Sequence, residues 1–153
     1  MIFYLDTSAL VKLYIGEPGS ADVRAWVTAA DAVGTSWVAY AETRAAFARA
    51  LREGATEPRH HAERVGRFNQ DWEALLRVHV LPPVARSAGD LSEVYGLRGF
   101  DAIHLASALW LRDKVGSAHL TFAAFDRRLQ GAAKRAGLQT TSPLGVGEPP
   151  PPQ

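Results

Sequence analysis

The sequence predicts an α/β fold in which a mostly parallel central sheet is covered by helices on both faces. Three observations lead to this prediction. Short apolar segments that are typical of buried strands alternate along the chain with helical segments. The first apolar segment, Ile2-Phe3-Tyr4-Leu5, ends directly on Asp6, and open α/β sheets place active-site residues at such strand ends. The chain has 153 residues, 47% of them hydrophobic, which suffices for one domain with a sizeable core.

The predicted strands are short apolar runs that stop at polar or turn-forming residues. They comprise residues 2–5, 33–35, 78–81, 119–122 and 138–140. Pro82 and Pro83 end the third of these runs, because proline cannot donate to a sheet. Gly137 separates the last run from the helix before it, as a helix C-cap glycine does.

The segments between the strands are predicted as helices, bounded by Gly, Pro and Ser residues. They comprise residues 8–15, 21–30, 37–52, 58–76, 84–95, 102–115 and 127–136. Ser36 is the expected N-cap of the third helix. From Pro143 onward the chain is rich in Gly and Pro, so we expect a domain over residues 1–142 and a disordered tail over 143–153.

Composition excludes several kinds of site. The chain has no cysteine, which rules out disulfides, thiol nucleophiles and zinc–thiolate centres. Its formal net charge of +1 points to no particular polyanionic partner, although arginines cluster between Arg44 and Arg67 and again between Arg127 and Arg135. Neither a basic leader with an apolar core nor a run of roughly 20 apolar residues is present. We therefore expect a soluble, cytoplasmic protein that does not enter a membrane.

Four acidic residues are the candidate site residues: Asp6, Glu42, Asp101 and Asp126. Asp6 and Asp126 each follow an apolar segment and precede a helix. A carboxylate in that position can serve as an N-cap, because its oxygen accepts from the unpaired N–H groups of the first helical turn. A cap and a functional carboxylate are therefore both open interpretations of these two residues.

Asp101 also fits an N-cap, in front of the helix that begins at Ala102. In that interpretation Phe100 and Leu105 form the hydrophobic staple that fixes the chain entering the helix. Capping and metal binding are compatible, since one carboxylate oxygen can do each. His104 lies one turn further along an otherwise apolar helix, and such a histidine is more often a buried structural residue than a general base.

Glu42 is unusual because its neighbours on the predicted helix are all apolar. The residues one turn before and after it are Val38, Ala39, Ala45 and Ala46. The small alanines would let the helix approach another element closely while the carboxylate points inward, although a glutamate at the boundary of an Ala-rich face gives the same pattern. Acids that meet at one sheet edge repel one another unless a cation holds them, and hard oxygen ligands favour Mg²⁺ or Mn²⁺.

These residues resemble the motifs of PIN-domain ribonucleases, and among them the VapC toxins of type II toxin–antitoxin systems. The first motif is Tyr4-Leu-Asp6-Thr-Ser-Ala-Leu-Val-Lys-Leu-Tyr14, and the second is Ala39-Tyr-Ala-Glu42. The third is Phe100-Asp101-Ala-Ile-His-Leu-Ala-Ser-Ala-Leu109. The segment Phe125-Asp126-Arg-Arg-Leu129 is similar to the C-terminal part of the family. The resemblance covers residues 1–142.

The resemblance implies a PIN-like three-layer α/β/α sandwich. It also implies that Asp6, Glu42 and Asp101 are catalytic and hold Mg²⁺ or Mn²⁺, with Asp126 as the fourth, more variable acid. Many relatives carry Thr or Ser two residues before that acid, whereas this chain has Ala124. The implied activity is endoribonuclease cleavage of RNA by metal-activated water. The implied partners are a VapB-like antitoxin protein and a second copy of the chain.

Two rival interpretations remain open on the sequence. A haloacid-dehalogenase-like phosphatase also carries an aspartate after its first strand, but that class requires a second aspartate two residues later, and Ser8 stands there. A catalytically weak PIN domain could instead serve as an RNA- or protein-binding module. Loss of one of the four acids would favour such a module, and all four are present.

Overall fold

The computed structural model describes residues 1–141 and shows a five-stranded sheet in the order β3-β2-β1-β4-β5. Every pair of neighbouring strands is parallel. The strands are β1 (Ile2–Leu5), β2 (Ala32–Ser36), β3 (Leu76–Val78), β4 (Leu120–Ala123) and β5 (Gln139–Thr140). The predicted parallel sheet is therefore confirmed, and β1 occupies the residues predicted for it.

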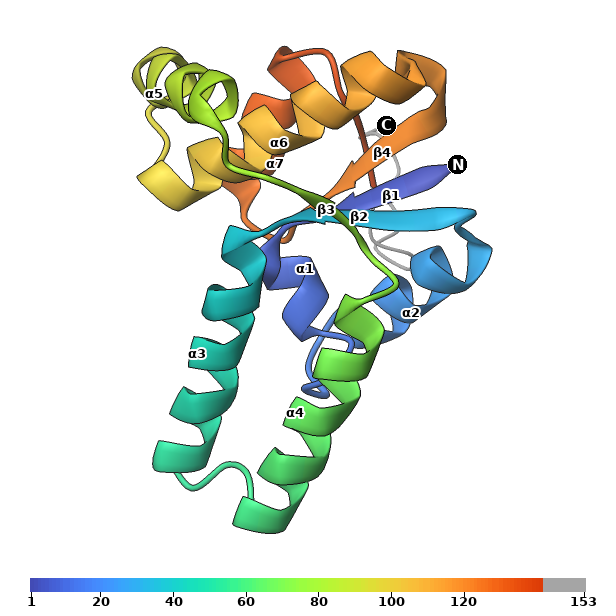
Figure 1. The fold of residues 1–153 in the computed structure, drawn as a ribbon, viewed down its shortest axis with the longest axis vertical. Helices are drawn as coiled ribbons and strands as arrows, with labels where there is room; N and C mark the ends of the chain where they lie inside the picture. The colour runs from blue at the N-terminus through green and yellow to red at the C-terminus, as the bar shows by residue number, and fades with distance from the viewer. Residues whose placement is uncertain (142–153) are drawn as a thin grey trace, which may run out of the picture.

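Helices connect the strands. They are α1 (Thr7–Val11), α2 (Ser20–Ala29), α3 (Val38–Arg52), α4 (Pro58–Trp72), α5 (Pro82–Tyr95), α6 (Gly99–Val115) and α7 (Arg127–Arg135), with a short 3-10 turn η1 (Ser117–His119). Figure 1 shows α5, α6 and α7 on one face of the sheet and α1 to α4 on the other. This is the predicted three-layer α/β/α sandwich.

The two layers of helices enclose two separate cores, because side chains along a strand point alternately to opposite faces of a sheet. Tyr4 packs with Phe122 and Leu105 on the α5–α7 face. Leu5, the next residue of β1, packs with Ala123 on the face that α1 to α4 cover. Neighbouring residues of β1 and of β4 thus contribute to opposite cores, so these two central strands pack against both layers of helices.

The third strand lies earlier in the chain than predicted. We expected residues 78–81, but β3 spans Leu76–Val78. Its register against β2 places Val78 opposite Ser36, and Val78 is buried whereas Leu81 is largely exposed. Pairing with β2 therefore decides the strand position, and α4 ends earlier than predicted, at Trp72, to leave room for it.

The helix that carries Asp101 starts earlier than predicted. Arg98 has an extended backbone and occupies the N-cap position of α6, and its carbonyl accepts from the N–H of Ala102 at 2.9 Å. Asp101 consequently lies inside the first helical turn, and the structure shows no side-chain cap bond at this end of α6. The predicted Asp101 cap, with Phe100 and Leu105 as a staple, is therefore wrong.

The predicted tail, 143–153, lies outside the described residues, so its predicted disorder and the boundary at 142 stay predictions. Within the described part of the chain, the helices all fall short of the length and hydropathy that crossing a bilayer requires.

Candidate active site

Asp6 joins β1 to α1 and is almost completely buried, with 3% of its surface exposed. Its Oδ1 accepts from the Ala9 N–H at 2.9 Å and from the Ser8 hydroxyl at 2.7 Å. The predicted N-cap is thus confirmed. Both of these bonds go to one oxygen, so the cap does not use the second oxygen of the carboxylate.

The pKa of Asp6 is raised to about 6 overall, and burial is the main cause. The charge of His104 and the hydrogen bonds from Ser8 and Ala9 act in the opposite direction, and the carboxylate of Asp101 raises the pKa further. An acid buried beside a second acid is poorly stabilised in its ionised form unless a cation is near.

Ser8 connects Asp6 to the segment that follows β4. The Ser8 hydroxyl donates to Asp6 and accepts from the backbone N–H of Phe125 at 3.0 Å. The N–H of Asp6 itself donates to the carbonyl of Ala123 at 3.1 Å. The ends of β1 and β4 are therefore connected at the place where Asp6 and Asp126 leave the sheet.

Glu42 lies on the second turn of α3 and reaches toward α1 and α6. Its Oε1 accepts from the Thr7 hydroxyl at 2.6 Å and lies 3.0 Å from Nε2 of His104. Burial raises the pKa of Glu42, but the hydrogen bonds from His104 and Thr7 and the charge of His104 outweigh that effect, so the pKa is below its ordinary value. The expectation that this carboxylate points inward is confirmed.

His104 is buried, as expected of a structural histidine, but it also touches the site directly. Its Nδ1 lies 3.0 Å from the Tyr4 hydroxyl, and its Nε2 lies 3.0 Å from both Glu42 and Thr7. When Tyr4 donates to Nδ1, the ring proton is on Nε2 and can be donated to Glu42. The sequence signal for this role is the spacing of three residues from Asp101, which places both on one side of α6.

Asp101 is partly buried at the start of α6, and burial raises its pKa. The carboxylates of Asp126 and Glu42 raise this pKa further, while His104 and Arg98 lower it. Asp101 thus interacts electrostatically with each of the other three predicted acids, since it also raises the pKa of Asp6.

Asp126 is exposed at the end of β4 and caps α7. Its Oδ1 accepts from the Leu129 N–H at 2.8 Å, which confirms the predicted cap. Ala124, at the position where many relatives carry a hydroxyl, is buried in the core on the α5–α7 face.

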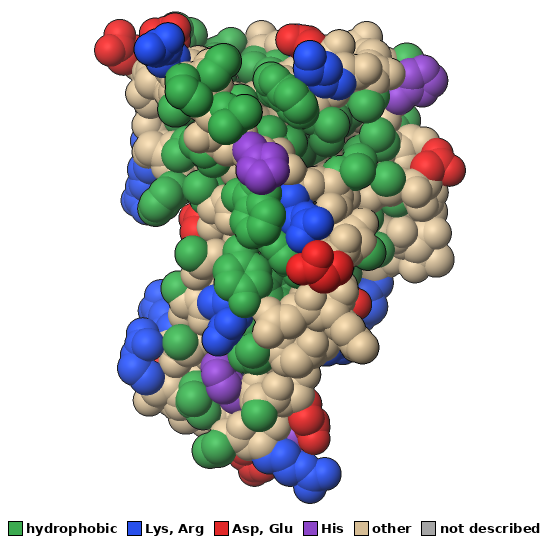
Figure 2. Space-filling view, viewed as in Figure 1, with side chains coloured by type: hydrophobic (Ala, Val, Ile, Leu, Met, Phe, Trp, Pro, Cys, Tyr) green, Lys and Arg blue, Asp and Glu red, His purple; other side chains and the backbone are tan. Residues whose placement is uncertain are grey.

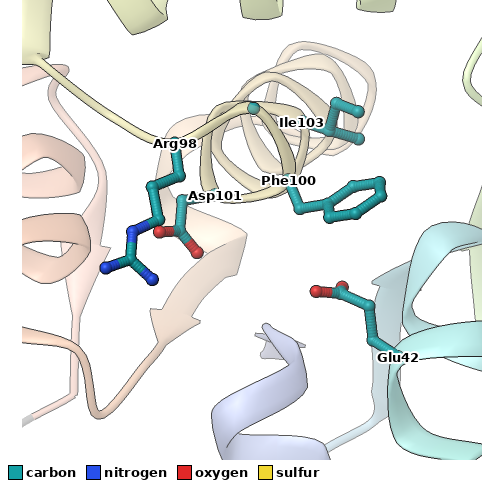
Figure 3. Close-up of a pocket in the computed structure, with 6 residues that line it drawn as sticks. Glu42, Arg98, Phe100, Asp101 and Ile103 are labelled. Atoms are coloured by element: carbon teal, nitrogen blue, oxygen red, sulfur yellow. The ribbon is translucent and has the colours of Figure 1, made fainter. Parts of the chain in front are cut away.

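A cavity of about 460 Å³ opens between α3 and the start of α6. Its lining residues are Glu42, Arg98, Gly99, Phe100, Asp101 and Ile103. Figure 3 shows the carboxylate of Glu42 directed across the cavity toward Asp101 and the ring of Phe100, with Arg98 beside Asp101. Two of the predicted acids therefore face one cavity.

The donor set fits a hard divalent cation, because carboxylate oxygens are the ligands that Mg²⁺ and Mn²⁺ prefer. Within residues 1–141, His, Asp and Glu side chains form no group of three or more close enough to count as an assembled metal centre. The fit therefore depends on the chemistry of the carboxylates: burial raises the pKa of Asp6 and of Asp101, neighbouring acids raise each further, and a bound cation would favour the ionised forms.

Comparison with known proteins identifies the family. The PIN domain model matches residues 3–135. The chain belongs to the PIN-domain family. Within it, this PIN domain is 39% identical over 138 residues to Ribonuclease VapC45 of Mycobacterium tuberculosis, an alignment that covers 90% of this chain and 93% of the relative. The resemblance seen in the sequence motifs, to the VapC group of PIN domains, is thereby confirmed.

Two solved structures share the fold. FitAcB from Neisseria gonorrhoeae has a TM-score of 0.66 at 21% identity, covering 95% of this PIN domain and 100% of the matched chain. A toxin–antitoxin complex from Klebsiella pneumoniae has a TM-score of 0.62 at 18% identity, covering 92% and 96%. At such low sequence identity, the TM-scores establish a shared fold and nothing more. The α/β/α arrangement of this fold is seen in Figure 1.

Proposed function

We propose that this PIN domain is a Mg²⁺- or Mn²⁺-dependent endoribonuclease. The observation that carries the proposal is the convergence of acids from three separate segments. Glu42 and Asp101 face one cavity, and buried Asp6 lies near enough to Asp101 for its pKa to be raised by that carboxylate. The family relationship to Ribonuclease VapC45 supports the same activity.

Asp6, Glu42 and Asp101 would hold the cation, and Asp126 would join them as a fourth acid at the exposed edge. A divalent cation bound there supplies activation of water and neutralisation of phosphate charge. Hydrogen bonds within the chain hold two of these acids in position. Ser8 and the Ala9 N–H fix Asp6, while Thr7 and His104 keep Glu42 ionised and oriented.

The proposed substrate is RNA, in a single-stranded or loop form whose backbone can enter an open cavity. The arginines of α4 contribute less to an RNA surface than the sequence suggests. Arg64 donates to the carbonyl of Tyr14 at 3.1 Å and Arg67 to that of Leu13 at 2.8 Å, so both tie α4 to the segment after α1.

The proposed biological role is that of a toxin controlled by an antitoxin. The structure from Klebsiella pneumoniae that shares this fold is a toxin–antitoxin complex, which supports a VapB-like protein as partner. We extend the proposal to a homodimer acting on RNA in the cytoplasm. Size-exclusion chromatography with light scattering, alone and with the candidate antitoxin, tests both partners.

Cleavage of single-stranded RNA tests the proposed activity. The wild-type protein should cleave it with Mg²⁺ or Mn²⁺, lose activity in EDTA and regain it when the ion is restored. Glu42→Gln and Asp101→Asn should abolish cleavage while leaving the circular dichroism spectrum unchanged. Glu93→Gln is the matched control, because Glu93 is an exposed acid on α5 outside the cavity.

Two results would contradict the proposal. Cleavage at wild-type rate by Asp101→Asn would remove that residue from the site. RNA binding without cleavage in either ion would favour a PIN domain that acts as a binding module.

A further inference from the structure

Phe100 is an exposed aromatic side chain in the cavity of the acids. It leaves 57% of its surface exposed although it belongs to the first turn of α6. The ring pairs among residues 1–141 join most other aromatic side chains, but none of them includes Phe100. Figure 3 shows the ring beside the carboxylate of Glu42. The ring therefore exposes apolar surface to the cavity.

Arg98 is a cation in the same cavity whose charge the rest of the described chain does not pair. Its guanidinium lies near enough to Asp101 to lower the pKa of that acid, yet within residues 1–141 it forms neither a hydrogen bond nor an ion pair. Other arginines of this face are engaged: Arg128 donates to the carbonyl of Gly96, and Arg112 pairs with Asp113. Arg98 therefore keeps its donors available for an anion.

The ring and the guanidinium flank Asp101 on α6 and share the cavity with Glu42. The cavity volume of about 460 Å³ falls in the range of roughly 300–1,000 Å³ that small-molecule sites occupy. Aromatic faces stack on nucleic-acid bases, and guanidinium groups bind phosphate through paired donors. A nucleotide presents both groups at once.

We propose that Phe100 and Arg98 form a nucleotide-binding subsite of the RNA-cleaving centre. The ring of Phe100 stacks on one unpaired base, and Arg98 binds a phosphate next to the bond that is cut. The subsite rests on the proposed ribonuclease function and explains how a cavity lined by acids attracts a polyanion. It requires a single-stranded substrate, because a base inside a duplex cannot reach the ring.

An RNA occupant fits the position of Phe100 better than a protein occupant does. The ring shares its cavity with two carboxylates, whereas protein interfaces are depleted of Asp and Glu. A protein partner at Phe100 is the competing outcome of the test.

Binding measured without cleavage tests the subsite. A short single-stranded RNA carrying 2-aminopurine is titrated with the full-length protein in EDTA, and its fluorescence reports stacking while the cation-dependent reaction is off. Phe100→Ala should weaken binding roughly ten-fold and abolish the quenching, as expected for loss of one stacked base. Phe100→Tyr should restore both. Val94→Ala, which shortens another exposed apolar side chain at 70% exposure outside the cavity, should change neither.

Arg98 is tested by the salt dependence of the same titration. Arg98→Gln should weaken binding and lower the slope of log affinity against log salt by about 0.7, the value for one phosphate contact on a single strand. Arg98→Lys should keep the slope. Arg86→Gln, an exposed arginine on α5 outside the cavity, is the matched control.

Unchanged quenching and affinity in Phe100→Ala would overturn the subsite. If that variant instead loses self-association in sedimentation velocity, Phe100 belongs to an interface between copies. These outcomes are separable from failure of the ribonuclease proposal, because stacking is measured in EDTA and cleavage in Mg²⁺ or Mn²⁺.

Discussion

Nε2 of His104 lies 3.0 Å from Oε1 of Glu42, which joins two residues 62 positions apart in the chain. The same imidazole contacts the hydroxyl of Tyr4 through its other nitrogen. His104 therefore links the centre of the sheet to a carboxylate that faces the cavity. A buried histidine in this position stabilises the fold and orients the acid, and both effects can be measured.

Replacing His104 by Leu should destabilise the protein by about 2–4 kcal/mol, because the hydroxyl of Tyr4 and the carboxylate of Glu42 both lose a buried partner. Urea unfolding measures this. Tyr4→Phe removes a single hydroxyl from the same network and should cost only about 1 kcal/mol. If His104→Leu unfolds at the wild-type midpoint, the network carries no stability.

Thr7 should matter for cation binding more than for the fold. Thr7→Val keeps the side-chain shape but removes the hydroxyl that donates to Glu42 at 2.6 Å, so the carboxylate becomes less acidic and less well oriented. We expect the affinity for Mn²⁺ to fall by about ten-fold, the usual effect of losing such a supporting bond, while Thr7→Ser retains it. Equal affinities of the two variants would refute this role.

The raised pKa of Asp6 predicts an unusual dependence of the protein's stability on pH in EDTA. Because its pKa in the folded state is raised from 3.8 to about 6, the folded protein binds a proton more tightly than the unfolded chain. Stability should therefore increase as the pH falls from 7 toward 4. At neutral pH the ionised carboxylate costs up to about 3 kcal/mol.

The matched variant for this effect is Asp6→Asn, which keeps an oxygen for the Ala9 N–H and the Ser8 hydroxyl. It should be more stable than the wild type at pH 7 in EDTA, and the difference should vanish near pH 4. Thermal unfolding at several pH values measures both. A variant that is less stable at every pH would show that the ionised carboxylate is already well accommodated.

Asp126 should show separable structural and functional roles. Asp126→Asn keeps the oxygen that accepts from the Leu129 N–H at 2.8 Å, whereas Asp126→Ala removes the cap and should cost about 1 kcal/mol. If Asp126 also serves the cation, both variants should lose RNA cleavage although only the alanine variant loses stability. Full cleavage by Asp126→Asn would restrict the residue to capping.

Local sequence signals predicted much of the fold. The apolar run 2–5 became β1 without a shift, and the acids that follow β1 and β4 became helix caps. These features depend on neighbouring residues alone. The position of β3 depends on pairing with β2, which is a long-range contact. The predicted start of this strand, residue 78, is therefore two residues later than the observed start at Leu76.

The sequence singled out the four candidate acids, whose role in a site stays a prediction, but it did not predict the residues around them. Asp101 looked like a cap because a polar residue precedes an apolar helix, yet α6 starts at Gly99 and leaves Phe100 exposed in the cavity. The contact between His104 and Glu42 also cannot be predicted from neighbouring residues, because it joins α3 to α6 across 62 positions of the chain. Such contacts between distant elements are set by packing.

The central claim is that the acids bind a divalent cation, and calorimetric titration of the metal-free protein with Mn²⁺ tests it most directly. Asp101→Asn is the decisive variant, because the side chain of Asp101 makes no cap hydrogen bond to α6, so we expect the replacement to leave the fold intact. The wild type should bind Mn²⁺, and the variant should bind it at least ten-fold more weakly. Equal binding by both proteins, or none by the wild type, would contradict the account.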